Sequence, residues 1–202
     1  MLIALDLETT GLDCTKHSIL EIGMIVFRND VEFKVSDSPS HPIFQQLVRD
    51  TKKEVDPDAI RVNGLNPDLV WNDPRSKSPA DLIDTIRQWL SALDLGKEKP
   101  RLLGHNVFFD IRFLENLYRD CGQNLWDMFD YHPVDTASVV QFLKDAERLP
   151  SDFPMSLHAI MRNKLQIPIL PVHEALSDCA YTIRLYNYLM ERVEKHGYHI
   201  VS

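Results

Sequence analysis

The stretch LIALDLETTG, residues 2–11, decides the fold, because an apolar run leads there into two acids and then into a turn. Residues 3–7 are typical of a buried strand, and residues 9–11 of the turn that ends it. Successive side chains of a strand point to opposite faces, so Asp6 and Glu8 leave one face while the apolar residues between them point to the other. Two carboxylates are therefore predicted to converge at the end of this strand.

Further strands are predicted before and after residue 58, where the hydrophobic pattern changes from the period of a strand to that of a helix. Antiparallel strands should follow at residues 19–27, at 31–35 after a hairpin turn at 28–30, and at 43–48. Short strands are expected at 101–104 and 133–134. Helical periodicity predicts helices at residues 58–62, 80–93, 107–121, 136–146, 156–165 and 174–196. Antiparallel strands followed by alternating strands and helices indicate an α/β fold, with a mixed sheet covered by helices.

The composition is that of an ordinary globular protein, with 44% hydrophobic and 26% charged residues over 202 positions. No linker, repeat or low-complexity segment divides the chain, so we expect a single domain over residues 1–202. No basic leader and no apolar run of roughly 18 residues is seen, which argues against secretion and against a membrane span. Three widely separated cysteines favour free thiols, and we expect a cytoplasmic location.

The formal net charge of -8 argues against a protein that coats DNA through a broad basic face. It leaves room for an enzyme that holds only the last few nucleotides through bound metals. Such a site gathers its own carboxylates, so the charge at the site can oppose the charge of the whole chain.

Asp6 and Glu8 have two interpretations. Crowded carboxylates in a partly buried site need a proton or a cation, and hard divalent cations such as Mg²⁺ or Mn²⁺ prefer oxygen ligands of this kind. Alternatively, the pair is a solvated strand end, because an Asp-x-Glu pattern is common. The spacing alone leaves both interpretations open.

Asp110 lies on the apolar stripe of its predicted helix, with Phe113, Leu114 and Leu117 three, four and seven residues onward. A carboxylate in that position is costly to desolvate unless it is paired or bound to a metal. No base on the same stripe supplies a partner, so a metal ligand is the favoured interpretation.

Asp178 repeats this pattern on the last predicted helix, where Tyr181 and Leu185 share its buried face. His173 lies five residues earlier, off that face but near the helix start, where a loop-like backbone can aim it at the same cleft. Taken alone, a histidine in this position is more often a hydrogen-bonding residue of a helix end than a general base.

Several other polar residues have structural interpretations. Glu21, within the second predicted strand, supports the acids or packs within the sheet. His105 and Asn106 are interpreted as a strand exit and a helix cap, and Asp135 as the N-cap of the helix that follows it.

Three motifs carry a family resemblance: ALDLETTGL at residues 4–12, HNVFFD at 105–110 and HEALSD at 173–178. Together they resemble the exonuclease motifs of the DEDD family, His subtype, which includes the proofreading epsilon subunit of bacterial replicative polymerases and RNase T. One such motif would be weak evidence, whereas three in this order are highly specific. The resemblance covers nearly the whole chain.

The resemblance implies a ribonuclease H-like fold, with a five-stranded mixed sheet flanked by helices. It also implies a 3′→5′ exonuclease that releases nucleoside monophosphates from DNA or RNA. Two divalent cations, Mg²⁺ or Mn²⁺, would be held by four acids while His173 acts as general base. The four implied metal ligands are Asp6, Glu8, Asp110 and Asp178.

Contacts to the terminal nucleotide are implied for Thr9, Leu12 and Phe109. The family has a His-Gly pair where this chain has Asn63-Gly64. Asn63 matches a substrate-binding position, but its role stays open, because an amide can donate a hydrogen bond and cannot titrate.

Two rival functions remain: a catalytically weak nucleic-acid-binding module of the same fold, and a metal-dependent hydrolase of another phosphoester. The first is disfavoured because all five expected catalytic residues are present. The second is disfavoured by the implied nucleotide contacts. DNA or RNA, single strand or duplex, a polymerase partner or a free-standing enzyme, and the oligomeric state all stay open.

Overall fold

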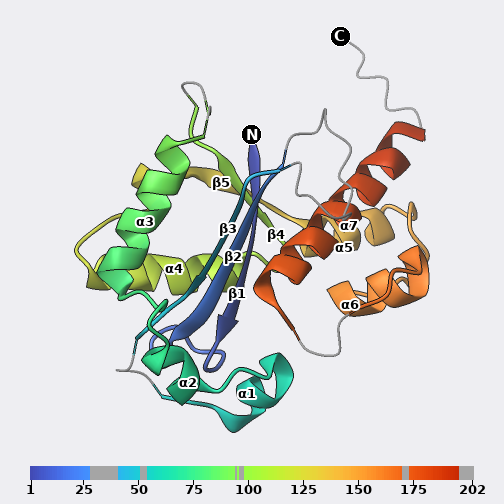
Figure 1. The fold of residues 1–202 in the computed structure, drawn as a ribbon. Helices are drawn as coiled ribbons and strands as arrows, with labels where there is room; N and C mark the ends of the chain where they lie inside the picture. Colours follow the sequence, from blue (N-terminus) through green and yellow to red (C-terminus); the bar gives the residue numbers. More distant parts are fainter. Residues whose placement is uncertain (28–40, 51–53, 94, 96–97, 170–172, 196–202) are drawn as a thin grey trace.

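The computed structural model describes residues 1–27, 41–50, 54–93, 95, 98–169 and 173–195. At its centre is a five-stranded sheet with the strand order β3-β2-β1-β4-β5 (Figure 1). The strands are β1 (Leu2–Thr9), β2 (Ile19–Phe27), β3 (Ile43–Leu47), β4 (Arg101–Gly104) and β5 (Asp130–Asp135). β1 pairs antiparallel with β2 and parallel with β4. At the two edges of the sheet, β3 pairs antiparallel with β2, and β5 pairs parallel with β4. The predicted mixed sheet is confirmed, while the predicted strand at 31–35 lies outside the described residues.

Helices connect the strands and cover the sheet. They are α1 (Pro57–Asn63), α2 (Pro67–Asn72), α3 (Pro79–Ser91), α4 (Phe108–Asp120), α5 (Thr136–Asp145), α6 (Leu157–Ile160) and α7 (Ala175–Lys195). A 3-10 turn, Leu125–Asp127, precedes β5, and a π turn, Met161–Leu165, continues α6. The single helix predicted at 156–165 is therefore two short pieces, and α2 was not predicted at all.

The first three helices begin with the same local signal. Asp56, Asn66 and Ser78 are each followed by a proline, and each side chain accepts a hydrogen bond from a backbone N–H of the first turn. The cap satisfies a donor that the helix leaves unpaired, and proline suits the first turn because it needs no N–H there. The missed helix α2 therefore carried a readable start signal at Asn66.

The two faces of the sheet are covered by different helices, as Figure 1 shows. Ile3, Leu5 and Leu7 of β1 pack in the hydrophobic cluster that contains the buried residues of α3 and α4. Leu2 and Ala4 belong instead to the cluster that contains Cys179 and Ile183 of α7. The alternation of β1 therefore directs its odd positions to α3 and α4 and its even positions to α7, which is the face that Asp6 and Glu8 share.

Gly23 of β2 lets α7 approach the sheet. A Cβ atom at this position would lie 2.7 Å from the carbonyl carbon of Ala175 and 2.8 Å from the nitrogen of Leu176. The first turn of α7 therefore rests directly on the strand. Because Gly23 is the register partner of Asp6, this contact also brings the helix start beside the acids of β1.

A separate cluster of apolar side chains joins α5, α6 and α7. Leu157 and Ile160 of α6 pack there with Tyr181 and Leu185 of α7. This packing fixes α6 against the first half of α7. Among the residues that the structure describes, no helix combines the length and the apolar character that crossing a bilayer requires.

Candidate active site

The acids of β1 lie at the end of the strand that faces α7. Glu8 is buried, and its register partner on β2 is a second acid, Glu21. Glu21 is held in place, because Gln45 donates to its Oε1 at 2.8 Å and the backbone N–H of Ala175 to its Oε2 at 3.5 Å. The expected supporting role of Glu21 thus takes the form of a link between β3, β2 and the start of α7.

Asp110 lies in the first turn of α4 and is 4% exposed. Its Oδ1 accepts a hydrogen bond of 3.1 Å from the backbone N–H of Leu7. The partner that the helix stripe lacked is therefore a peptide group of β1. Since a helix N-terminus also favours negative charge, the carboxylate is held at the acidic end of β1 without a basic side chain.

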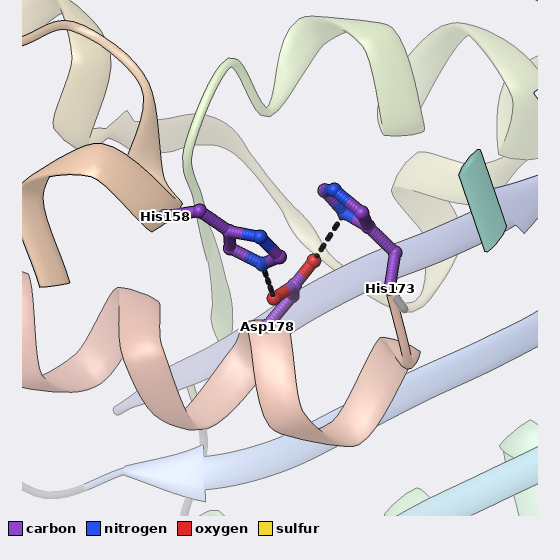
Figure 2. Close-up of side chains that lie close together, drawn as sticks. All are labelled: His158, His173 and Asp178. Carbon is purple, nitrogen blue, oxygen red and sulfur yellow. Dashed lines mark hydrogen bonds and ion pairs between the residues drawn. The ribbon is translucent and has the colours of Figure 1, made fainter. Parts of the chain in front are cut away.

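Two imidazoles face the carboxylate of Asp178, one at each oxygen (Figure 2). His158 Nε2 is 2.6 Å from its Oδ1, and His173 Nδ1 is 2.9 Å from its Oδ2. The two rings stack, with centroids 4.0 Å apart and an angle of 20° between their planes. His173 precedes α7 and turns back onto the helix, as a loop-like backbone at that point allows.

The surroundings shift the pKa values of the four acids in different directions. Burial raises the pKa of Glu8 to about 8. Burial also raises the pKa of Asp6, with further contributions from the charges of Asp110 and Asp178, and burial raises the pKa of Asp110. Burial acts on Asp178 in the same sense, but the hydrogen bonds from the two histidines outweigh it and hold its pKa below the ordinary value.

The raised pKa values of Asp6, Glu8 and Asp110 are typical of a cation-binding site, because without the cation a proton must reduce the repulsion between the carboxylates. Ligand oxygens of Asp6, Glu8 and Asp178 lie within 4.8 Å of one another. Three ionised carboxylates so close together in a buried site repel one another, and a divalent cation relieves that repulsion. The all-oxygen donor set fits a hard cation, with Asp110 beside it.

A pocket of about 410 Å³ opens next to the acids. Glu8 and His173 line it together with all four side chains expected to contact substrate: Thr9, Leu12, Asn63 and Phe109. Leu12 is 78% exposed, so a large apolar side chain stands at the pocket without a covering residue. The structure thus brings every predicted site residue to the acidic end of β1, from four separate segments of the chain.

Asn63 has a clear structural role within this pocket. Its Nδ2 donates to the carbonyl of Thr9 at 3.0 Å, and its Oδ1 accepts from the N–H of Leu65 at 3.0 Å. The buried amide therefore ties the end of α1 to the end of β1 and shapes the pocket wall through the backbone.

Sequence reasoning missed His158. It lies 20 residues before Asp178, in a helix of four residues, and no spacing rule connects the two. Asp135 does cap α5 as predicted, and its Oδ1 also accepts from the N–H of Asn106. Asn106 itself is not a helix cap; it adopts the left-handed region with φ 66° and turns the chain from β4 into α4.

Comparison with known families adds an independent finding. The sequence profile of the RNase T family, described as exonuclease, matches residues 3–186. The chain belongs to this exonuclease family. The expected membership of an exonuclease family that includes RNase T is thereby confirmed.

Relatives and solved structures agree with this family. The "3'-5' exonuclease DinG" of Staphylococcus aureus is 24% identical over 191 residues, which cover 94% of this chain. The match is only 18% of the DinG sequence, so the chain spans about a fifth of that relative.

Two solved nucleases show the same fold. E. coli exonuclease I in complex with a dT13 oligonucleotide superposes with a TM-score of 0.72 at 18% identity, over 96% of this chain and 42% of that one. The nuclease domain of 3'hExo, a DEDDh family member bound to rAMP, gives 0.66 at 17% identity, over 97% and 92%. The expected ribonuclease H-like fold is therefore confirmed.

Proposed function

We propose that residues 1–202 form a single exonuclease domain that removes nucleoside monophosphates from the 3′ end of DNA or RNA. The observation that carries the proposal is the meeting of two features at one strand end. Oxygens of Asp6, Glu8 and Asp178 lie within 4.8 Å of one another, and the pocket lined by the residues expected to contact the nucleotide opens beside them.

Asp6, Glu8, Asp110 and Asp178 would hold two divalent cations, Mg²⁺ or Mn²⁺. Bound there, the cations supply charge neutralisation at the scissile phosphate and lower the pKa of water. The protein contributes the positions of the four carboxylates: β1 supplies two, while α4 and α7 supply one each. The hydrogen bond from Leu7 holds Asp110 in place, and the two histidines orient Asp178.

His173 is the proposed general base. Because Nδ1 faces Asp178, the neutral ring that donates from Nδ1 carries its lone pair on Nε2. Nε2 can then accept a proton from the water that attacks the phosphorus. The carboxylate stabilises the imidazolium that forms, and this is the same contact that raises the pKa of His173 above its ordinary value.

The size and the lining of the pocket suit the single nucleotide at the end of a nucleic-acid strand. Its volume of about 410 Å³ lies toward the lower end of small-ligand pockets. Leu12, Val62 and Phe109 offer apolar surface to a base or sugar. Among the described residues that line the pocket, histidine aside, the charged side chains are the acids Glu8, Asp56 and Asp58. We infer that phosphate charge is neutralised by the metals and not by basic side chains of the pocket.

The test is digestion of labelled oligonucleotides. Matched DNA and RNA strands, single and duplex, with the 3′ or the 5′ end blocked, should release mononucleotides from the open 3′ end with Mn²⁺ and none with EDTA. Binding without release would favour the catalytically weak module. Hydrolysis of small phosphoesters, with oligonucleotides left intact, would favour the other hydrolase.

A further inference from the structure

In the reaction proposed above, His158 orients Asp178 but contacts no reacting atom. Its ring is mostly buried, with 16% of the side chain exposed. Packing of α6 against α7 fixes its backbone, and its ring meets Tyr181 edge-on at 5.8 Å and stacks on His173. A buried imidazole placed this firmly against a carboxylate has the properties of a metal ligand.

The donors around Asp178 form two different sets. With Asp6 and Glu8, Asp178 makes a cluster of oxygens only. With His158 and His173, the same residue makes a cluster of two imidazole nitrogens and a carboxylate, again with ligand atoms within 4.8 Å of one another. Oxygen ligands suit Mg²⁺ and Mn²⁺, whereas imidazole suits zinc and other late transition metals.

We propose that His158, His173 and Asp178 form a second cation site, selective for a borderline metal ion such as Zn²⁺ (Figure 2). The two histidines approach different oxygens of the carboxylate, Nε2 of His158 at 2.6 Å and Nδ1 of His173 at 2.9 Å. Both nitrogens lie at the ring edges that face Asp178, so an ion bound at these edges, beside the carboxylate, reaches both nitrogens and at least one oxygen.

Coordination of one ion requires two changes, because the stacked rings must turn until both nitrogens point at the ion, and the contacts to the carboxylate must lengthen. Neighbouring ligands of a tetrahedral Zn²⁺ with bonds of about 2.0 to 2.1 Å lie roughly 3.3 Å apart. The histidine-to-carboxylate contacts must therefore open by about half an ångström, as the hydrogen bonds give way to metal bonds. Any proton held between a ring and the carboxylate leaves to solvent, because the metal binds neutral imidazole and ionised carboxylate.

This second site shares Asp178 and His173 with the proposed catalytic site. An ion bound there would occupy one acid and the general base, so it excludes full assembly of the oxygen site. Zn²⁺ would then inhibit hydrolysis supported by Mn²⁺; this consequence, unlike the site itself, rests on the proposed function.

Calorimetric titration of the metal-free protein with Zn²⁺ and with Mn²⁺, in the absence of nucleic acid, tests the site without using activity. His158→Gln keeps a donor toward Asp178 but removes the imidazole ligand. It should lower Zn²⁺ affinity by about 10²-fold or more, because loss of a direct ligand costs at least as much as loss of a residue that only supports one, and it should leave Mn²⁺ affinity close to that of the wild type. Asp6→Asn should do the reverse.

His132→Gln is the matched control. His132 also contacts an aspartate, at 2.9 Å from Asp130, but this pair is exposed and has a single histidine. Its loss should change neither affinity. Far-ultraviolet circular dichroism verifies the fold of His158→Gln, and His173→Gln replaces it if that variant does not fold. Equal Zn²⁺ affinity in wild type and His158→Gln, or a Zn²⁺ affinity that falls as far in Asp6→Asn, would overturn the proposal whatever the result of the nuclease assay.

Discussion

At the scale of single residues, Asp178 behaves differently from the other acids of the site. The pKa of Glu8 is raised to about 8 by burial, whereas that of Asp178 is lowered because two imidazoles donate to it. Asp178 therefore ionises more readily than an ordinary aspartate, whereas Glu8, with a pKa of about 8, releases a proton when a cation binds near neutral pH. The neighbours of each carboxylate, more than the carboxylate itself, set its charge.

His173→Ala should keep Mn²⁺ binding and lose on the order of 10²- to 10⁴-fold in rate, the usual contribution of a positioned general base. The hydrogen bond to Asp178 raises the pKa of His173. Protonated imidazole cannot accept a proton, so the wild-type rate should rise with pH around a midpoint above about 6.5. Rate against pH at saturating Mn²⁺, for both proteins, checks this.

In the His173→Ala variant that acidic limb should vanish or move. A thermal shift with Mn²⁺ equal to that of the wild type shows that the metal still binds. Superimposable pH profiles and similar rates would remove His173 from the mechanism.

Substitution of each metal ligand should abolish most activity with little loss of fold. Removing a carboxylate empties the site and at the same time relieves the crowding of charge. In Asp110→Asn the side-chain oxygen can still accept from the N–H of Leu7. Turnover and the metal-free thermal midpoint are to be measured for Asp6→Ala, Glu8→Ala, Asp110→Asn and Asp178→Ala. Near wild-type turnover of any one variant, or a sharp drop in all four midpoints, would contradict the assignment of these four acids as metal ligands.

At the scale of elements, the contact between β2 and α7 positions half of the site. Gly23 faces the backbone of Ala175 and Leu176, at the start of the helix that carries Asp178. His173 precedes the same turn. A change in the distance between this strand and this helix therefore moves the fourth acid and the general base together, relative to Asp6 and Glu8.

Gly23→Ala is expected to destabilise the protein by about 1 to 3 kcal/mol, because the new methyl group meets backbone atoms that cannot rotate away. Displacement of α7 by about 1 Å should also cost on the order of 10²-fold in rate. Urea unfolding and turnover at saturating Mn²⁺ measure the two effects.

Gly122→Ala provides the control for Gly23→Ala. Gly122 has φ +69°, and a Cβ there meets nothing within 4 Å. Its replacement strains the backbone without moving α7, so stability should fall while the rate per folded molecule stays unchanged. Equal rate losses in the two variants would show that activity does not depend on the contact between β2 and α7.

At the scale of the whole molecule, the site opposes folding unless a cation or protons are present. The folded-state pKa of Glu8, about 8, exceeds its ordinary value of 4.5. The folded protein thus holds a proton that the unfolded chain has lost, and stability falls as pH rises from about 4.5 through 8. The raised pKa of His173 acts in the same sense, while the lowered pKa of Asp178 adds nothing further above its ordinary value.

The thermal midpoint of the metal-free protein should therefore be lower at pH 8 than at pH 5.5. Added Mn²⁺ should raise it, by more at pH 8, because a ligand that binds only the folded site stabilises by mass action and competes there with fewer protons. Differential scanning calorimetry at both pH values, with Mn²⁺ or with EDTA, measures the difference. A midpoint indifferent to Mn²⁺ at pH 8 would count against a clustered carboxylate site.

Much of this site was predictable from local spacing. The period of a strand places Asp6 and Glu8 on one face, and the period of a helix places Asp110 and Asp178 on buried stripes. These rules depend only on backbone geometry within one element, so they hold whatever packs outside it. Together with the order of the three motifs, they predicted the α/β fold, the mixed sheet and the residues that meet.

Tertiary packing decided what surrounds those residues. The N–H of Leu7 reaches Asp110 across 103 positions, and His158 reaches Asp178 across 20. Neither contact follows a helical or strand period, because each joins two elements whose separation is set by packing, in the first case of α4 on β1 and in the second of α6 on α7. Side-chain direction is a local property of the chain, whereas the partner that a side chain meets is a property of the packed core.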